Sequence, residues 1–314
     1  MRESGSNLPP ESFDDEIDLR DLLRLVWAGK WLIGGITFTA TILAVIVALM
    51  LPNVYRAEAL LAPNDQEGAG GLSALAAQYG GLASLAGINL KSGKTDKTVL
   101  GLEVLKSRRF ISEFIERHEL LVPLMAAEGW DAETDDLKLD ADIYDVAEKK
   151  WVRDISPPRK PVPSMQEAYK EFMKILSASQ DKKSGFVRIS VEFYSPTLAK
   201  QWVDWLIDDL NESIMQQDVA EAEQAVKYLN MQIENTSLAE LQNVFFRLIE
   251  EQTKTVMLAK VSSEYLLKTV DPAIAPELKS KPKRSLIVLM AAMLGGFLGL
   301  VIQLLRPRNA ILRE

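Results

Sequence analysis

Two long apolar runs without a charged side chain stand near the two ends of the chain, at residues 31–51 and 285–305. An α-helix rises about 1.5 Å per residue, so about 21 residues cover about 31 Å, the thickness of a bilayer's hydrocarbon core. The pattern therefore predicts one transmembrane helix near each end. A cleaved signal peptide does not fit the first run, which is too long and follows roughly thirty acid-rich residues.

The region between the two runs carries several strand patterns. Residues 186–193 alternate between apolar and polar side chains, which predicts a half-buried strand. Residues 54–61 and 265–270 also favour strands. The first follows one predicted membrane helix and the second leads through a proline-rich segment, residues 271–284, into the other. We therefore expect these two strands to lie close to the bilayer and to pair in one sheet.

A long helix is predicted after the alternating strand. Ser195 is an N-cap residue and Pro196 fits the first turn, and the helical pattern then continues for about 40 residues to about Asn235. The nearly all-polar middle of this helix needs neighbouring helices or exposed charge pairs. Residues 237–240 have the spacing of a capping box and open a second helix, whose 3-4-3 apolar rhythm is typical of coiled coils and fades at Ser262.

The remaining segments give weaker patterns. Residues 98–121 predict one helix, residues 144–152 are a further helix candidate, and Ser164 begins a capping box that predicts a helix through Leu176. Residues 68–93 consist mostly of Gly, Ala, Leu and Ser. A flexible or partly helical loop is expected there, and contact with a ring interior or with the membrane is the open alternative.

The charges that flank the first run predict its orientation. Arg20, Arg24 and Lys30 precede it, and only Arg56 follows closely. Basic residues beside a membrane helix favour the cytoplasm, so both termini are predicted there. Four basic residues just before the second run disagree mildly, but charges in a long translocated domain count for little.

This orientation divides the chain into five parts. Residues 1–30 and 306–314 are expected in the cytoplasm, residues 31–51 and 285–305 in the membrane, and residues 52–284 outside the inner membrane, in the periplasm of a Gram-negative cell. The expected fold class is an α+β membrane protein. Two transmembrane helices flank a periplasmic domain with a membrane-proximal α/β base and long protruding helices.

Composition removes several kinds of chemistry. The chain has no cysteine, which excludes disulfides, thiolate metal sites and cysteine nucleophiles. The net charge of −8 argues against a nucleic-acid partner. Residues 92–95 resemble the end of a phosphate loop, but Ile88 stands where its first glycine belongs. No cofactor and no metal are expected.

The candidate catalytic residues are few. The single histidine, His118, has charged neighbours and is expected on the surface rather than in an active site. Because no catalytic role is proposed for it, His118→Ala is expected to leave function unchanged. The acidic pairs Asp135-Asp136 and Asp208-Asp209 are expected to be solvated. We find no nucleophile–base pair, and the protein is predicted not to be an enzyme.

Small residues mark the second apolar run. Gly295 and Gly299 are four apart and therefore share one helix face, which would let two membrane helices approach closely. The alternative is that glycine is simply tolerated in a membrane helix.

The chain resembles the chain-length determinant family, the Wzz-type polysaccharide co-polymerases. Residues 15–19, 252–255 and 271–273 are similar to family segments, and the family's proline- and glycine-rich motif over the second span is matched by Pro276, Pro282, Lys283, Gly295, Gly296 and Gly299. The chain departs from the motif at Pro272, one position off an expected proline, and at Lys281, Phe297, Leu300 and Val301. These departures put in doubt the fine tuning of function by the motif, but not the resemblance to the family.

The resemblance implies an inner-membrane protein that assembles into a homo-oligomeric ring. It also implies that the protein acts together with the O-antigen polymerase, which extends an undecaprenyl-pyrophosphate-linked glycan. The protein would set the length of this glycan without making bonds itself. The alternative is a capsule or exopolysaccharide export co-polymerase with a separate cytoplasmic tyrosine kinase, since residues 306–314 are too short for a fused one. A two-span sensor and a periplasmic hydrolase are weaker alternatives. A sensor needs a cytoplasmic output domain and a hydrolase needs an active site, and neither is predicted here.

Overall fold

The computed structural model describes residue 27 and residues 29–64, 97–236 and 238–305. The expectations for residues 1–26, 68–93 and 306–314, for Ile88 and for the cap at Ser237 therefore lie outside the described residues. The chain forms two compact units. One contains the two apolar helices, and the other is Pro52–Lys281.

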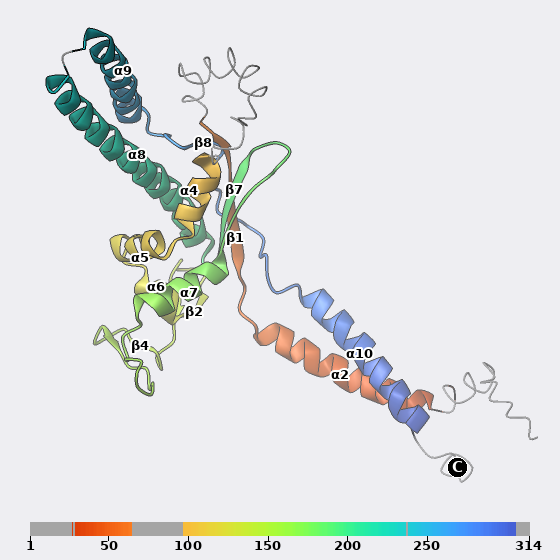
Figure 1. Ribbon diagram of the computed structural model, residues 1–314. Helices are drawn as coiled ribbons and strands as arrows, with labels where there is room; N and C mark the ends of the chain where they lie inside the picture. Colours follow the sequence, from red (N-terminus) through yellow and green to blue (C-terminus); the bar gives the residue numbers. More distant parts are fainter. Residues whose placement is uncertain (1–26, 28, 65–96, 237, 306–314) are drawn as a thin grey trace, which may run out of the picture. The chain divides into compact units, whose positions relative to one another are not determined.

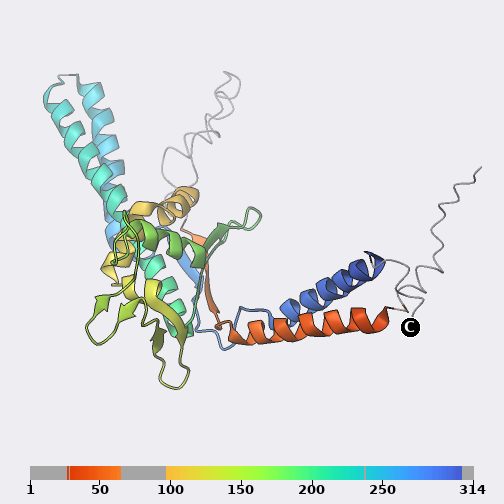
Figure 2. The ribbon, with the colours of Figure 1, turned by 90° about the horizontal axis from the view of Figure 1, so that it is seen from below.

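The first unit is a pair of antiparallel helices, α2 (Lys30–Met50) and α10 (Arg284–Leu305), which pack along each other (Figure 2). Their apolar windows have mean hydropathies of 2.4 and 2.5, and only 6% and 11% of those windows are buried. A core helix of a soluble protein would be buried instead. The pair is therefore long and apolar enough to cross a membrane, within one residue of the predicted bounds.

The second unit is built on a four-stranded antiparallel sheet of order β6-β7-β1-β8. Its strands are β1 (Tyr55–Pro63), β6 (Leu176–Gln180), β7 (Val187–Phe193) and β8 (Leu267–Asp271). The predicted pairing of the first and last strands is confirmed, with Leu61 opposite Thr269 and Pro63 opposite Leu267. An isolated bridge between Val54 and Lys281 joins the points where the chain enters and leaves this unit.

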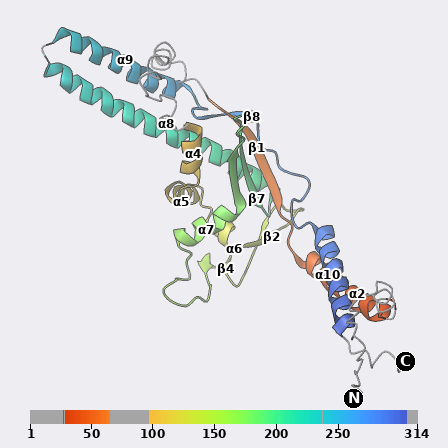
Figure 3. The same cartoon turned by 45° about the vertical axis from the view of Figure 1, so that its right-hand side comes forward.

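Two long helices run side by side in this unit, α8 (Pro196–Glu234) and α9 (Ala239–Val261) (Figures 1 and 3). The Ser195 side chain accepts a hydrogen bond from Leu198 N, and this cap starts α8 where the sequence predicted it. The first half of α8 packs on the sheet. The second half extends away from the sheet together with α9 (Figure 3).

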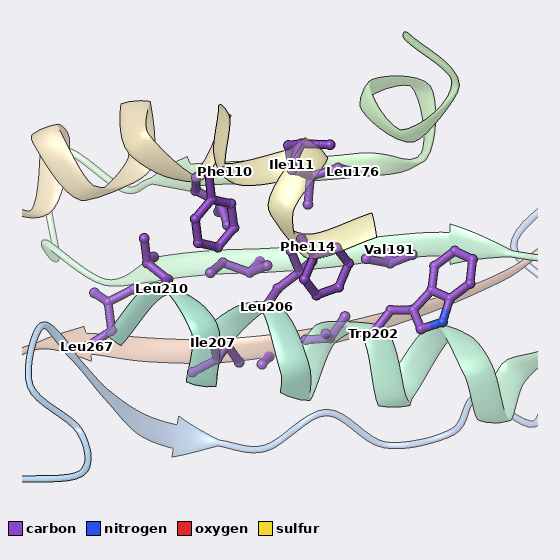
Figure 4. Packing of buried hydrophobic residues seen from close by; sticks show 14 of the residues in the cluster. Phe110, Ile111, Phe114, Leu176, Val191, Trp202, Leu206, Ile207, Leu210 and Leu267 are labelled. Carbon is purple, nitrogen blue, oxygen red and sulfur yellow. The ribbon is translucent and has the colours of Figure 1, made fainter. Parts of the chain in front are cut away.

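The core lies between the sheet, α8 and four shorter helices. Trp202, Leu206 and Leu210 of α8 are fully buried, and they gather with Phe114 of α5 and Val191 of β7 (Figure 4). The shorter helices are α4 (Lys97–Leu105), α5 (Arg108–Arg117), α6 (Leu121–Ala126) and α7 (Met165–Ile175). The α7 helix starts at Ser164, whose side chain accepts from Glu167 N as predicted.

Two predictions about local structure are wrong. Residues 98–121 do not form one helix, because Ser107 adopts an extended conformation and caps a new helix by accepting from Phe110 N. Residues 144–152 form a hairpin of β4 (Tyr144–Asp145) and β5 (Lys150–Trp151), with Tyr144 packed on Trp151. A further hairpin joins β2 (Ala127–Trp130) to β3 (Leu137–Leu139).

Candidate functional site

The glycine face of α10 lies against α2. Gly295 and Gly299 are buried. A Cβ built on Gly295 would lie 2.9 Å from Ala40 Cβ and 3.1 Å from Thr37 Cα, and one on Gly299 would lie 3.0 Å from Ile33 Cα. These distances are shorter than ordinary van der Waals contacts, so the two backbones approach each other closely because neither glycine carries a side chain.

The neighbouring Gly296 has a different position on the helix. A Cβ there would lie 3.6 Å from Thr37 Oγ1, which is an ordinary contact. Thr37 and Thr41 donate their hydroxyl protons to the carbonyls of Ile33 and Thr37, four residues earlier on α2, so the hydroxyls are satisfied within the helix. The tight part of the interface is therefore the line of Gly295 and Gly299.

One further contact in this helix pair was not predicted. Gln303 is only 4% exposed and packs against Gly29, where an added Cβ would clash with the Gln303 side chain. The sequence did contain a signal for this contact, because Gln303 is a polar side chain inside an apolar run. The close approach of α2 and α10 thus extends from the middle of the pair to the beginning of α2.

The motif residues before α10 are arranged without regular structure. Pro276 and Pro282 are half-buried, and Lys283 is exposed. The Lys283 carbonyl accepts hydrogen bonds from Leu286 N and Ile287 N, and so begins the hydrogen bonding of α10. Pro282 lies two positions before the first residue of α10, and its carbonyl accepts from Arg284 N. The functional role of all six motif residues stays a prediction.

A second cluster of polar residues lies between α5 and α8. The Arg117 guanidinium donates to Asp209 Oδ1 and to Glu212 Oε2, both at 2.9 Å, and His118 Nε2 lies 3.0 Å from Asp209 Oδ2. The His118 ring stacks on Trp205 with 4.2 Å between centroids and an angle of 10°. The charge of Asp209 is the largest cause of the raised pKa of Arg117, followed by burial, which lowers it.

This cluster corrects two expectations. The side chains of His118 and Asp209 are 16% and 12% exposed, so neither is a solvated surface residue. The partners are 91 residues apart, and the tertiary packing of α5 on α8 brings them together. The expectation that His118→Ala leaves function unchanged depends on the absence of a catalytic role, and it stays a prediction.

The other acidic residues in the predicted pairs also have defined surroundings. Asp135 accepts hydrogen bonds from Trp130 Nε1 and from the Thr197 hydroxyl, which tie the β2–β3 hairpin to the start of α8. Partial burial, and then the charges of Asp204, Asp209 and Glu264, raise the pKa of Asp208. Within the described ranges, no group of three or more His, Asp or Glu side chains is placed to hold a metal ion.

These observations define a class of protein: an α+β membrane protein whose mixed domain lies, in the sequence, between two apolar helices that pack on each other through glycine. Two family models match the chain. "Chain length determinant protein" matches residues 15–118, and "G-rich domain on putative tyrosine kinase" matches residues 218–308. Together they include the first span, the last strand and the second span. The chain therefore contains one segment that matches the chain length determinant model and another that matches the G-rich domain model.

Solved structures give further similarities. A full-length bacterial polysaccharide co-polymerase is 15% identical with a TM-score of 0.37, covering 94% of this chain and 98% of that one. A fragment of WzzB, a polysaccharide co-polymerase from Salmonella Typhimurium, is 13% identical with a TM-score of 0.26, covering 73% of this chain and all of that one. No curated protein matches the sequence.

Proposed function

We propose that the protein regulates the chain length of lipopolysaccharide O-antigen, or of a related undecaprenyl-linked surface polysaccharide. It acts as a ring-forming co-polymerase in the bacterial inner membrane, beside the polymerase that makes the glycosidic bonds. The observation that carries the proposal is the chain length determinant match over the first span and the first strand, in a chain with a second apolar helix after the domain. The protein itself makes no bond in this proposal.

The proposed orientation places residues 52–284 in the periplasm, where such glycans are polymerised. Arg20, Arg24 and Lys30 precede the apolar run 31–51 and only Arg56 follows it closely, which supports this orientation. We expect an alkaline phosphatase fusion at Gly5, and one at the C-terminus, to be inactive, while cytoplasmic reporters at the same points are active. Phosphatase activity from either fusion would contradict the orientation.

Homo-oligomerisation is supported by apolar side chains on α8 and α9. Tyr228, Phe246 and Met257 are 58%, 55% and 64% exposed, although aromatic and methionine side chains favour buried contacts between proteins. A ring of identical subunits gives each α8–α9 pair two neighbours. These positions are where the neighbours would pack.

We expect detergent-extracted protein to behave as a large homo-oligomer in light scattering. Phe246→Glu combined with Met257→Glu should reduce the assembly size, because a charge inside an apolar contact loses its hydration. The control is Asn230→Glu, which adds a charge at an exposed polar position of α8. A monomeric wild-type protein that still restores function to a deletion strain would rule out the ring.

The function itself is tested by deleting the chain in its own strain. The expected result on a lipopolysaccharide gel is loss of the modal cluster of O-antigen lengths, with restoration by the wild-type protein. An unchanged ladder, together with unchanged sizes of the other surface polysaccharides, would refute the proposed function.

A second candidate is a capsule or exopolysaccharide export co-polymerase that works with a separate tyrosine kinase. The observation that favours it is the match of residues 218–308 to a domain described on putative tyrosine kinases. The same deletion separates the candidates. A normal O-antigen ladder with shortened or missing capsule, and reduced phosphotyrosine on a cytoplasmic kinase, would favour the export role.

A further inference from the structure

A groove of about 540 Å³ lies between α5 and α8, beside the Arg117–Asp209 ion pair. Its volume falls within the range of roughly 300–1,000 Å³ that small-ligand sites occupy. Most of its lining side chains are polar, and they come from both helices: Arg109, Glu113, Arg117, Glu212, Gln216 and Gln217. The groove belongs entirely to the domain between the two apolar helices.

The polar wall of the groove is held in place by its own hydrogen bonds. Arg117 bridges Asp209 and Glu212, and the other oxygen of Glu212 accepts from the Gln216 amide at 2.9 Å. Arg109 donates to Glu113 across one turn of α5, also at 2.9 Å. Groups that are already fixed lose little freedom when a ligand arrives, and such preorganisation favours binding.

Aromatic rings pack beside Asp209, which anchors Arg117 in the lining of the groove. His118 contacts Asp209 Oδ2, stacks on Trp205, and lies 4.9 Å from the Phe114 ring centroid. Phe114 is fully buried. The anchoring carboxylate of Asp209 therefore has both of its oxygens occupied and cannot swing away, while Glu212 and Gln216, which are exposed, face solvent.

The chemistry of the lining selects the class of ligand. An apolar ligand would remove water from charged groups without replacing their hydrogen bonds, which is unfavourable. An anion would meet the carboxylates of Glu113, Asp209 and Glu212. A neutral ligand with many hydroxyl groups can instead donate to the carboxylates and accept from the guanidinium and amide groups, and hydrogen bonds to charged groups are the stronger kind.

We propose that this groove binds a short stretch of the polysaccharide whose length the protein controls. The inference rests on the proposed function and adds a direct contact between protein and glycan. Such a contact would give each subunit a means of holding the growing chain near α8. The contact is made by hydroxyl groups of the sugars, so no lipid carrier is needed for it.

The test uses the full-length protein in detergent. The probe is a short oligosaccharide of two or three repeat units, prepared from the strain's own O-antigen and released from lipid by mild acid. Binding is measured by saturation-transfer NMR and by calorimetry. Glu212→Gln should weaken the affinity about tenfold, as expected for losing one hydrogen bond to a charged group. Gln217→Trp should block the groove with an indole ring.

Matched controls lie on the same helix outside the groove. Glu223→Gln and Gln224→Trp make the same two changes at exposed positions further along α8, and they should bind like the wild type. Circular dichroism shows whether each variant is folded. In the cell, Glu212→Gln and Gln217→Trp should shift the modal glycan length, whereas the two controls should not.

Two outcomes overturn the inference. Wild-type protein that sets glycan length in the cell but binds no oligosaccharide would refute direct binding while the proposed function stands. Equal binding by the groove variants and their controls would place the glycan elsewhere. Failure of the proposed function itself is distinguishable, because the deletion strain would then keep its normal ladder.

Discussion

Gly295→Leu combined with Gly299→Leu is expected to leave expression and membrane insertion intact but to broaden or shorten the glycan length distribution. Both glycines face α2, and even a single Cβ would lie about 3 Å from Ala40, Thr37 or Ile33. A leucine adds three further carbons, so the two helices must separate. Hydrocarbon provides no hydrophobic force to hold them together, and helix association in membranes depends on close packing.

The matched control for this double variant is Gly34→Leu combined with Gly35→Leu on α2. A Cβ at either of these positions has no heavy atom within 4 Å among the described residues outside the local helix. The control therefore adds the same apolar volume without touching the helix contact. The measurement is the ladder on a lipopolysaccharide gel at matched protein levels. If the control loses the modal length and the Gly295 and Gly299 variant keeps it, close packing does not set the function.

Asn211→Leu is expected to cause the largest loss of domain stability. The buried Asn211 amide accepts from Leu266 N and Leu267 N, both at 2.9 Å, and donates to the Leu267 carbonyl at 3.0 Å. Leucine fills a similar volume but leaves three backbone groups without these partners. At about 1–3 kcal/mol for each buried unpaired group, the expected loss is about 3–9 kcal/mol. A domain's whole stability is typically only about 5–15 kcal/mol.

The measurement is thermal unfolding of the detergent-purified protein, followed by circular dichroism. A loss of this size should lower the Tm by about 10 °C or more in a domain of this length. Asn230→Leu makes the same change at an exposed position of α8 and should leave the Tm within about 2 °C, since exposed sites usually contribute little. Equal melting of the two variants would show that the Asn211 hydrogen bonds contribute little to stability.

The sequence predicted the elements whose signals are local. Ser195 with Pro196 defined the start of α8, and alternation over 186–193 defined β7. The pairing of β1 with β8 was also predicted, because each strand is connected to one of the apolar runs and both were therefore expected close to the bilayer. In these cases a few neighbouring residues determine the backbone conformation.

Features that depend on distant partners were not predicted. Ser107 lies in a helical sequence pattern, but its backbone is extended and its side chain accepts from Phe110 N, so it separates α4 from α5. His118 looks exposed between charged neighbours, but Trp205 and Asp209 from α8 cover it. Likewise, the contact of Gln303 with Gly29 joins the two ends of the chain. Periodicity within one segment contains no information about which other segment will cover it.

The pairing of β1 with β8 has a consequence for biosynthesis. Leu61 emerges from the ribosome roughly two hundred residues before its partner Thr269. Until β8 is made, one edge of β1 has unpaired N–H and C=O groups, and open edges of this kind recruit other strands. Pairing between distant segments is also slow to form. The domain can therefore complete its sheet only when synthesis has nearly reached the second apolar helix, and a chain interrupted before β8 would present an aggregation-prone strand edge.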